Sequence, residues 1–186
     1  MTQAEWVQAI AHRLRSSAVG RSRALKIRTG LGLAYSYEIV SYQESSGPRR
    51  ADFKTDLASV ETTSDGSWKP RVVIAAKIQS VTTHDTIMYS HKAATHRSVH
   101  PYVRYGVILG GQERNPLSGR LVRRGARLDF MISFRGTHLS ADEFARFIRF
   151  LRSELTASRN MERILYESRK RDRHRYTFLH RRLVTR

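Results

Sequence analysis

Residues 71–78 read RVVIAAKI, a nearly continuous apolar run interrupted close to its end by one lysine, Lys77. Runs of Val, Ile and Ala without polar alternation are typical of a strand that is covered on both faces of a sheet. An ammonium group in such surroundings is costly to bury unless a partner neutralises it. The run therefore predicts a central strand, and it makes Lys77 the first candidate for a functional side chain.

Helices and strands alternate in the segments around this strand. A helix is predicted over residues 3–16, where Thr2 and Glu5 have the spacing of a capping box and apolar residues recur on one face. The other expected elements are 33–42, left open between helix and strand, a turn at 45–50, a strand over 51–60, a turn over 61–70, a helix over 85–98, a strand over 102–109, a basic loop over 114–127, a strand over 128–134, and a long helix that begins near Ser140 and bends near 158–160.

This order of elements predicts the α/β class, with a mixed β-sheet flanked by helices. No internal repeat or composition shift marks a boundary, so one domain is expected over residues 1–186. The sheet core is expected over about 30–135 and a C-terminal helical part over about 140–186. An apolar content of 40% is sufficient for a packed core and speaks against global disorder.

The charge balance indicates the class of partner. The 186 residues include 34 Lys and Arg against 16 Asp and Glu, a formal net charge of +18. Such an excess concentrates polyanions around a protein, and it is typical of proteins that bind nucleic acid. A generic basic protein, such as a ribosomal or solubility-biased one, is the alternative.

Other features limit the chemistry and the location. The chain has no cysteine, which excludes disulfides, thiolate zinc sites and thiol nucleophiles. No apolar run approaches the roughly 18 residues that a membrane span requires, so no membrane partner is expected. The first residues predict an amphipathic helix instead of a signal peptide, and an intracellular, cytoplasmic location with access to a prokaryotic nucleoid is expected.

An acid and a lysine are expected to meet beside the central strand. Side chains two residues apart on a strand share a face, so Ala75 and Lys77 point the same way. If the strand over 51–60 pairs with the strand over 71–78, Asp56 comes close to that face. A carboxylate and an ammonium group from neighbouring strands would then converge at one edge of the sheet.

These residues resemble the motif of the PD-(D/E)xK nuclease superfamily. Thr55-Asp56 matches the first half of the motif, and Ala75, Ala76 and Lys77 match the second half behind an apolar Val-Val-Ile. Gln79 matches a glutamine often found shortly after the lysine. The resemblance covers roughly residues 30–135 and implies a restriction endonuclease-like fold. Thr55 replaces the usual proline, which is a minor departure.

The resemblance also implies a metal and roles for these residues. In this family two carboxylates hold Mg²⁺ beside the scissile phosphate, so Asp56, with the backbone carbonyl of Ala76, would bind the ion. Lys77 would orient or help deprotonate the attacking water and stabilise charge on the phosphate. Glu38 would be a further metal ligand if 33–42 is helical, and an exposed surface acid otherwise.

Ala75 stands where the family has its second acid, and this is the serious departure. Alanine offers a metal ion no oxygen, so a site with Ala75 is expected to be disabled. Three explanations stay open: a substitution introduced to trap an uncleaved complex, a natural member that lost activity, or a misaligned motif.

Clusters of basic side chains are expected to contact the nucleic acid. Guanidinium groups suit both phosphates and guanine edges, and most such contacts go to phosphate. The candidates are Arg49, Arg50, Lys54, Arg97, Arg104, Arg120, Arg123, Arg124 and Arg127. The basic segment 168–186 would wrap DNA or end a solvated helix. The histidines, among them His91, His96 and His100, lack an accompanying acid and are expected to be structural or exposed.

Three functions follow from the sequence. The first is a Mg²⁺-dependent, sequence-specific endonuclease of restriction type acting on double-stranded DNA, present in an active-site-disabled form. The second is a non-catalytic nucleic-acid-binding protein in which Asp56 and Lys77 form a structural pair. The third is a nuclease-fold enzyme acting on RNA or branched DNA. A homodimer is a further expectation for the first function, because cutting both strands of a duplex suits two-fold symmetry.

Overall fold

The computed structural model describes residues 1–22, 24–39, 41–42, 47–112 and 117–167. Within this part of the chain the main sheet has five strands in the order β1-β4-β5-β6-β7. Its strands are β1 (Leu25–Thr29), β4 (Leu57–Thr62), β5 (Trp68–Ile78), β6 (Arg104–Gly110) and β7 (Phe130–Ser133). β1, β4 and β5 pair antiparallel, while β5, β6 and β7 pair parallel. The predicted α/β class with a mixed sheet is confirmed, and β5 is its central strand.

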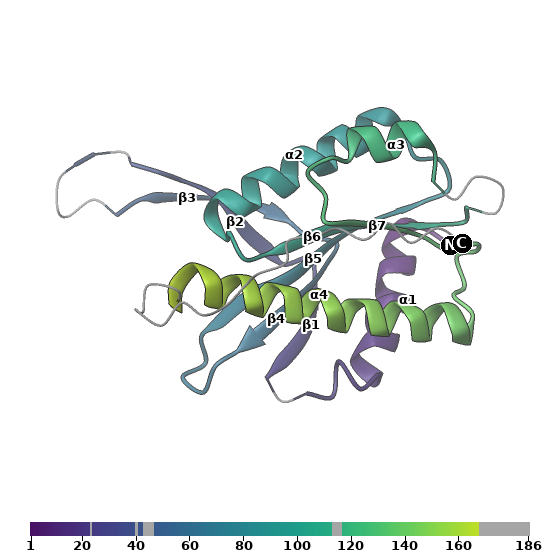
Figure 1. Ribbon diagram of the computed structural model, residues 1–186, viewed down its shortest axis with the longest axis horizontal. Coiled ribbons are helices and arrows are strands. Elements are labelled where there is room, and N and C mark those ends of the chain that lie inside the picture. Colours follow the sequence, from purple (N-terminus) through teal and green to yellow (C-terminus); the bar gives the residue numbers. More distant parts are fainter. Residues whose placement is uncertain (23, 40, 43–46, 113–116, 168–186) are drawn as a thin grey trace.

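Helices cover both faces of this sheet (Figure 1). One face carries α1 (Gln3–Ser16) and α4 (Ala141–Glu167), and the other carries α2 (Thr83–Val99) and α3 (Gly119–Arg124). β5 serves both layers. Val72, Ile74 and Ala76 belong to the apolar cluster that includes α1 and α4, whereas Val73 and Ala75 belong to the cluster that includes α2 and α3. The period of two therefore puts Lys77 on the α2 side.

Trp6 fixes α1 to the end of β6. The capping box predicted for this helix is present, with the Thr2 hydroxyl and the Glu5 carboxylate each accepting a backbone N–H of the other residue. Trp6 is fully buried, and its Nε1–H donates to the carbonyl oxygen of Thr137 at 2.7 Å. A Cβ at Gly110 would lie 2.6 Å from the Trp6 ring, so only glycine allows the indole to pack there.

A two-stranded arm projects from the body of the protein (Figure 1). It consists of β2 (Gly32–Glu38) and β3 (Arg49–Lys54), which pair antiparallel in a separate sheet. The segment 33–42, for which the sequence left helix and strand open, therefore forms a strand as far as Glu38. The single strand predicted over 51–60 is wrong, because β3 ends at Lys54 and β4 begins at Leu57. Thr55 forms the corner between them by exchanging backbone hydrogen bonds with Gly30 and Leu31.

One strand was not predicted, and three further predictions differ from the structure. β1 was not predicted, and the turn over 61–70 is shorter because β5 already begins at Trp68. The predicted basic loop over 114–127 contains the helix α3, while residues 113–116 lie outside the described part. The bend expected near 158–160 is absent from α4, in which Ser158 is buried inside a continuous helix. Residues 168–186 also lie outside the described part.

His96 joins the arm to α2 and to the main sheet. Its ring is buried between Phe53 of β3 and Tyr105 of β6, and its Nδ1 lies 3.1 Å from the Ala34 carbonyl oxygen. Burial lowers the pKa of His96, and burial also lowers the pKa of His100 at the end of α2. The expectation that these histidines are structural is consistent with this packing.

These two histidines predict how stability depends on pH. Their folded pKa values lie below the unfolded value near 6.5, so the unfolded chain takes up protons first as the pH falls. The unfolding free energy is therefore expected to drop by roughly 1–2 kcal/mol between pH 7 and pH 5. Urea titrations at several pH values measure it. The variant His96→Gln/His100→Gln should flatten the dependence, whereas His91→Gln at an exposed position should leave it unchanged.

Candidate functional site

Asp56 lies at the corner between the arm and the main sheet. Leu57 pairs with Ile74, so Asp56 comes alongside the next residues of β5, and its Oδ2 accepts the Ala76 N–H at 2.8 Å. Burial raises the pKa of Asp56, opposed by the Ala76 hydrogen bond and by the charge of Lys92. Within the described residues no ion pair holds this carboxylate. A half-buried carboxylate of this kind favours a nearby cation.

Lys77 lies further along β5 and faces the first turn of α2. Its Nζ is 3.2 Å from Oδ1 of Asp85, and both side chains are partly exposed. Asp85 also accepts hydrogen bonds from the N–H and hydroxyl of Thr82, forming the capping box that starts α2. Burial disfavours the charged form of Asp85, but the bonds from Thr82 and Lys77 outweigh it and lower its pKa.

Asp56 lies on the same side of the sheet as Lys77, because Leu57 belongs to the apolar cluster that includes α1 and α4 and Ala58 belongs to the cluster that includes α2 and α3. Burial raises the pKa of Tyr89 in α2 to about 12, with further contributions from the charges of Asp56 and Asp85. Burial and the charge of Asp56 also raise the pKa of Tyr105 in β6. Both tyrosines pack in the apolar cluster under α2, on the side of the sheet where Asp56 lies. We name Asp56, Lys77, Asp85 and Tyr89 the polar cluster.

Asp85 and Tyr89 were missed by sequence reasoning. A signal for Asp85 existed, because Thr82 and Asp85 have the spacing of a capping box directly after β5. Tyr89 follows Asp85 by four residues and so lies on the same face of the helix. What the sequence could not give is that this face of α2 lies over the end of β5.

Ala75 presents a methyl group at the position where the family resemblance implies a second acid. It is 4% exposed and belongs to the apolar cluster under α2. In the described part of the chain, no three acids or histidines gather in a way that could hold a metal ion. Asp56 has no ion pair within the described residues, and Asp85 is already engaged by Lys77 and Thr82. The described side chains around Asp56 therefore do not by themselves supply a full set of oxygen ligands for Mg²⁺.

Glu38 does not lie near Asp56. Its role as a metal ligand required a helix over 33–42, but Glu38 is the last residue of the strand β2 and pairs in register with Arg49. Gly32, at the other end of β2, pairs with Lys54 beside the corner. Six residues of strand separate the two ends, roughly 20 Å. Glu38 is thus an exposed acid of the arm.

Gln79 follows β5 in a strained backbone conformation. Its φ of 61° is in the left-handed region, which is uncommon for residues other than glycine. The Gln79 N–H donates to the Gly110 carbonyl oxygen at 2.9 Å, and the Gln79 carbonyl accepts from the Gln112 side chain. The Gln79 side chain is exposed. These bonds hold the chain in a sharp change of direction immediately after Lys77.

The basic candidates divide by their partners. Arg97 and Arg104 bind Asp129, and Arg104 also binds Glu154, so both are engaged inside the protein. Arg50 of the arm pairs with Asp52. The remaining candidates are exposed, and no ion pair holds them within the described residues: Arg49 and Lys54 of the arm, and Arg120, Arg123, Arg124 and Arg127 in and beside α3.

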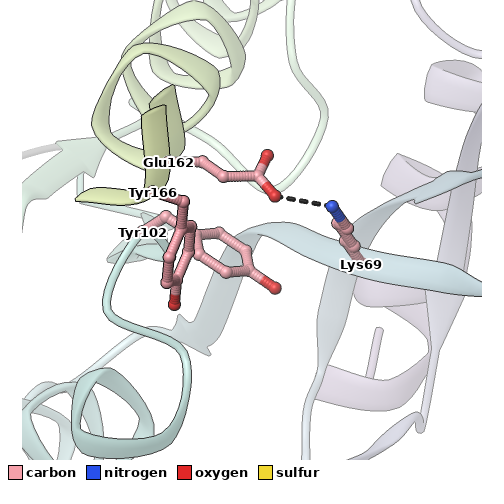
Figure 2. Close-up of a pocket in the computed structure, with 4 residues that line it drawn as sticks. All are labelled: Lys69, Tyr102, Glu162 and Tyr166. Carbon is pink, nitrogen blue, oxygen red and sulfur yellow. Dashed lines mark hydrogen bonds and ion pairs between the residues drawn. The ribbon is translucent and has the colours of Figure 1, made fainter. Parts of the chain in front are cut away.

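Two hollows are lined by charged side chains. Figure 2 shows the first, of about 500 Å³, where Lys69 of β5 reaches Glu162 of α4 at 2.7 Å beside Tyr102 and Tyr166. Glu162 also binds the buried Arg71 at 2.6 Å. The cation and the acid of this hollow are paired with each other. We therefore infer that the hollow serves to hold α4 against β5. It lies eight residues, roughly 26 Å, along β5 from Lys77.

The second hollow lies between α2 and α3. It measures about 540 Å³ and is lined by Thr83 of α2 and by Arg120, Arg123 and Arg124 of α3. We name it the arginine pocket. Thr83 stands in the first turn of α2, two residues before Asp85, so the arginine pocket and the polar cluster share one helical turn.

None of the helices in the described residues combines the length and the apolar character that crossing a membrane requires. Comparison with protein-family models gives no match, and comparison with curated proteins gives none either.

Proposed function

We propose that this protein binds the backbone of double-stranded DNA and carries, at the polar cluster, a disabled form of a Mg²⁺-dependent, restriction-type endonuclease site of the PD-(D/E)xK kind. The observation that supports this most is the position of Asp56. Its carboxylate is fixed on the Ala76 N–H, on the side of β5 to which Ala75 and Lys77 belong. An acid, a position two residues before a lysine, and that lysine thus lie on one side of two paired strands.

Nucleic-acid binding is supported by charge and by its distribution. The net charge is +18, and the exposed arginines of α3, which have no ion pair within the described residues, lie in the helical layer on the side of the sheet where Lys77 lies. Arginine forks match phosphate oxygens, and backbone phosphates supply much of the affinity of such complexes. The arm adds a β-ribbon, a shape that the major groove of B-DNA admits.

In the active form of such a site, the residues of this chain would act as follows. Lys77 would leave Asp85 for the scissile phosphate, where its ammonium group stabilises developing charge and orients the attacking water. Asp56 would be the acid that faces the phosphate. A divalent ion would supply charge neutralisation there, but Ala75 leaves its ligand set incomplete.

A non-catalytic binding protein is the second candidate, and one observation favours it. Lys77 already has a carboxylate partner in Asp85. This ion pair offsets the free-energy cost of burying the ammonium group without any substrate. In that case Asp56 would serve to cap the Ala76 N–H. Both candidate functions have the DNA backbone as ligand. They differ in the expected result of replacing Ala75 with an acid, which should produce cleavage only for the nuclease site.

The shared prediction is strongly salt-dependent binding of duplex DNA. Affinity for a labelled 30-base-pair duplex is expected to fall by roughly 10³-fold between 50 and 200 mM salt, because bound arginines release counterions from the phosphates. Fluorescence anisotropy across this range measures it. Duplex RNA of the same sequence and the single DNA strand are the controls, and the DNA duplex should bind most tightly. Affinity that does not change with salt would contradict the proposal.

A further inference from the structure

Among the residues that the structure describes, the lining of the arginine pocket contains no acid, unlike the surroundings of Arg71, Arg97 and Arg104. Arg97 and Arg104 surround Asp129, and Arg71 is held by Glu61 and Glu162. In contrast, the residues that line the arginine pocket are three arginines and one threonine. Within the described residues, no ion pair engages any of these three arginines.

Three cations around one hollow favour the binding of an anion between them. Like charges at short range repel one another, and in this protein the net charge of +18 adds to the repulsion. All three side chains are exposed, and they line a common hollow of about 540 Å³. Guanidinium forks bind phosphate oxygens in bidentate fashion, and the Thr83 hydroxyl adds one more donor.

The location of the arginine pocket indicates which phosphate it takes. Thr83 and Asp85 belong to the same first turn of α2, and Asp85 is the partner of Lys77. A strand of nucleic acid with one phosphate at Lys77 would therefore continue over this turn. The positive end of the helix dipole favours an anion at the same place.

We infer that the arginine pocket is a phosphate subsite, in which Arg120, Arg123, Arg124 and Thr83 together hold one backbone phosphate of the DNA strand that passes Lys77. This inference rests on the proposed function and specifies it. Three arginines that share one phosphate differ measurably from three arginines that bind three phosphates, because counterion release counts phosphates and not arginines.

The experiment compares salt dependence of duplex binding, without Mg²⁺, in the wild type and in Arg120→Gln/Arg123→Gln/Arg124→Gln. Loss of one shared phosphate should reduce the slope of log affinity against log salt by about 0.9 and lower affinity about tenfold at fixed salt. The control Arg146→Gln/Arg149→Gln/Arg152→Gln removes the same charge from exposed positions of α4, on the other face of the sheet. It should leave the slope within a few tenths of wild type.

The outcomes separate the inference from the proposed function. A slope reduced by about 2.7 would mean three separate phosphates and would overturn the single subsite. A slope equal to that of the α4 control would show that the arginine pocket takes no phosphate, while the proposed function stands. A wild-type protein with no salt-dependent binding of duplex DNA would end both. Circular dichroism of each variant verifies that the exposed substitutions leave the fold intact.

Discussion

Replacing Ala75 with glutamate is expected to produce Mg²⁺-dependent cleavage of plasmid DNA at least about 100-fold above the wild-type rate. The reason is geometric. Position 75 belongs to the same side of β5 as Lys77, and the Asp56 carboxylate is hydrogen-bonded to the adjacent Ala76 N–H. A second carboxylate there would complete an oxygen ligand set for a hard divalent ion beside the phosphate. Gel assays of supercoiled plasmid with and without Mg²⁺ measure the gain.

The matched control for this gain is Ala75→Gln, which has nearly the same shape and no charge. It should stay inactive with Mg²⁺. Adding Asp56→Asn or Lys77→Ala to the glutamate variant should remove the gained cleavage. A second readout is stability: the buried glutamate should lower the melting temperature without metal, and Mg²⁺ should raise it in this variant but not in Ala75→Gln. If the glutamate variant does not cleave DNA and Mg²⁺ does not raise its melting temperature, the result favours a non-catalytic binding protein.

Replacing Trp6 with alanine is expected to destabilise the protein by about 3–5 kcal/mol. The indole is fully buried between α1, the end of β6 and Phe134, and it also satisfies the carbonyl oxygen of Thr137. Alanine would leave a large cavity and an unpaired buried acceptor. Chemical denaturation followed by circular dichroism gives the unfolding free energy directly.

The chain supplies its own control in its other tryptophan. Trp68 at the start of β5 is 40% exposed, so Trp68→Ala removes the same side chain and should cost under about 1 kcal/mol. Equal losses from the two substitutions would show that α1 is not fastened through Trp6. In the Trp68→Phe background, Trp6 is the single tryptophan, and its fluorescence reports whether α1 detaches before the sheet unfolds.

The central strand could be predicted because its signal is local. Residues 71–78 are apolar on both faces, and such a run has few other uses in a protein of this size. β1 was missed because it is a five-residue strand at the edge of the sheet with two exposed basic residues. α3 was missed for a similar reason, since Leu121 is the apolar side chain that it buries and gives no periodic stripe.

The break between β3 and β4 depends on distant residues. The alternating pattern continues through 51–60 without interruption, so periodicity alone predicts one strand. In the structure the backbone of Thr55 bonds to Gly30 and Leu31, more than twenty residues away, and this turns the chain at Asp56. Ser158 in α4 is the opposite case, where a small buried side chain allows close packing instead of a bend.

The part of the candidate site that depends on strand pairing could be predicted from the sequence. A period of two puts Ala75 and Lys77 on one side, and an antiparallel neighbour brings Asp56 beside them. The partner of Lys77 could not be predicted, because Asp85 depends on the path by which α2 crosses the sheet. Which arginines form ion pairs could not be predicted either. Asp129 and Glu154 are distant from Arg104 in sequence and reach it only in the folded protein.

The two-sided packing of β5 limits where this gene can gain or lose a codon. A single-residue insertion between Val72 and Lys77 would rotate every later side chain of the strand to the opposite layer. The lysine would then be driven into the hydrocarbon under α1 and α4, and an aliphatic residue would stand beside Asp56. The exposed β4–β5 loop near Asp65 has no such constraint and should accept added residues. Length variation among descendants of this chain should therefore concentrate in that loop and spare β5.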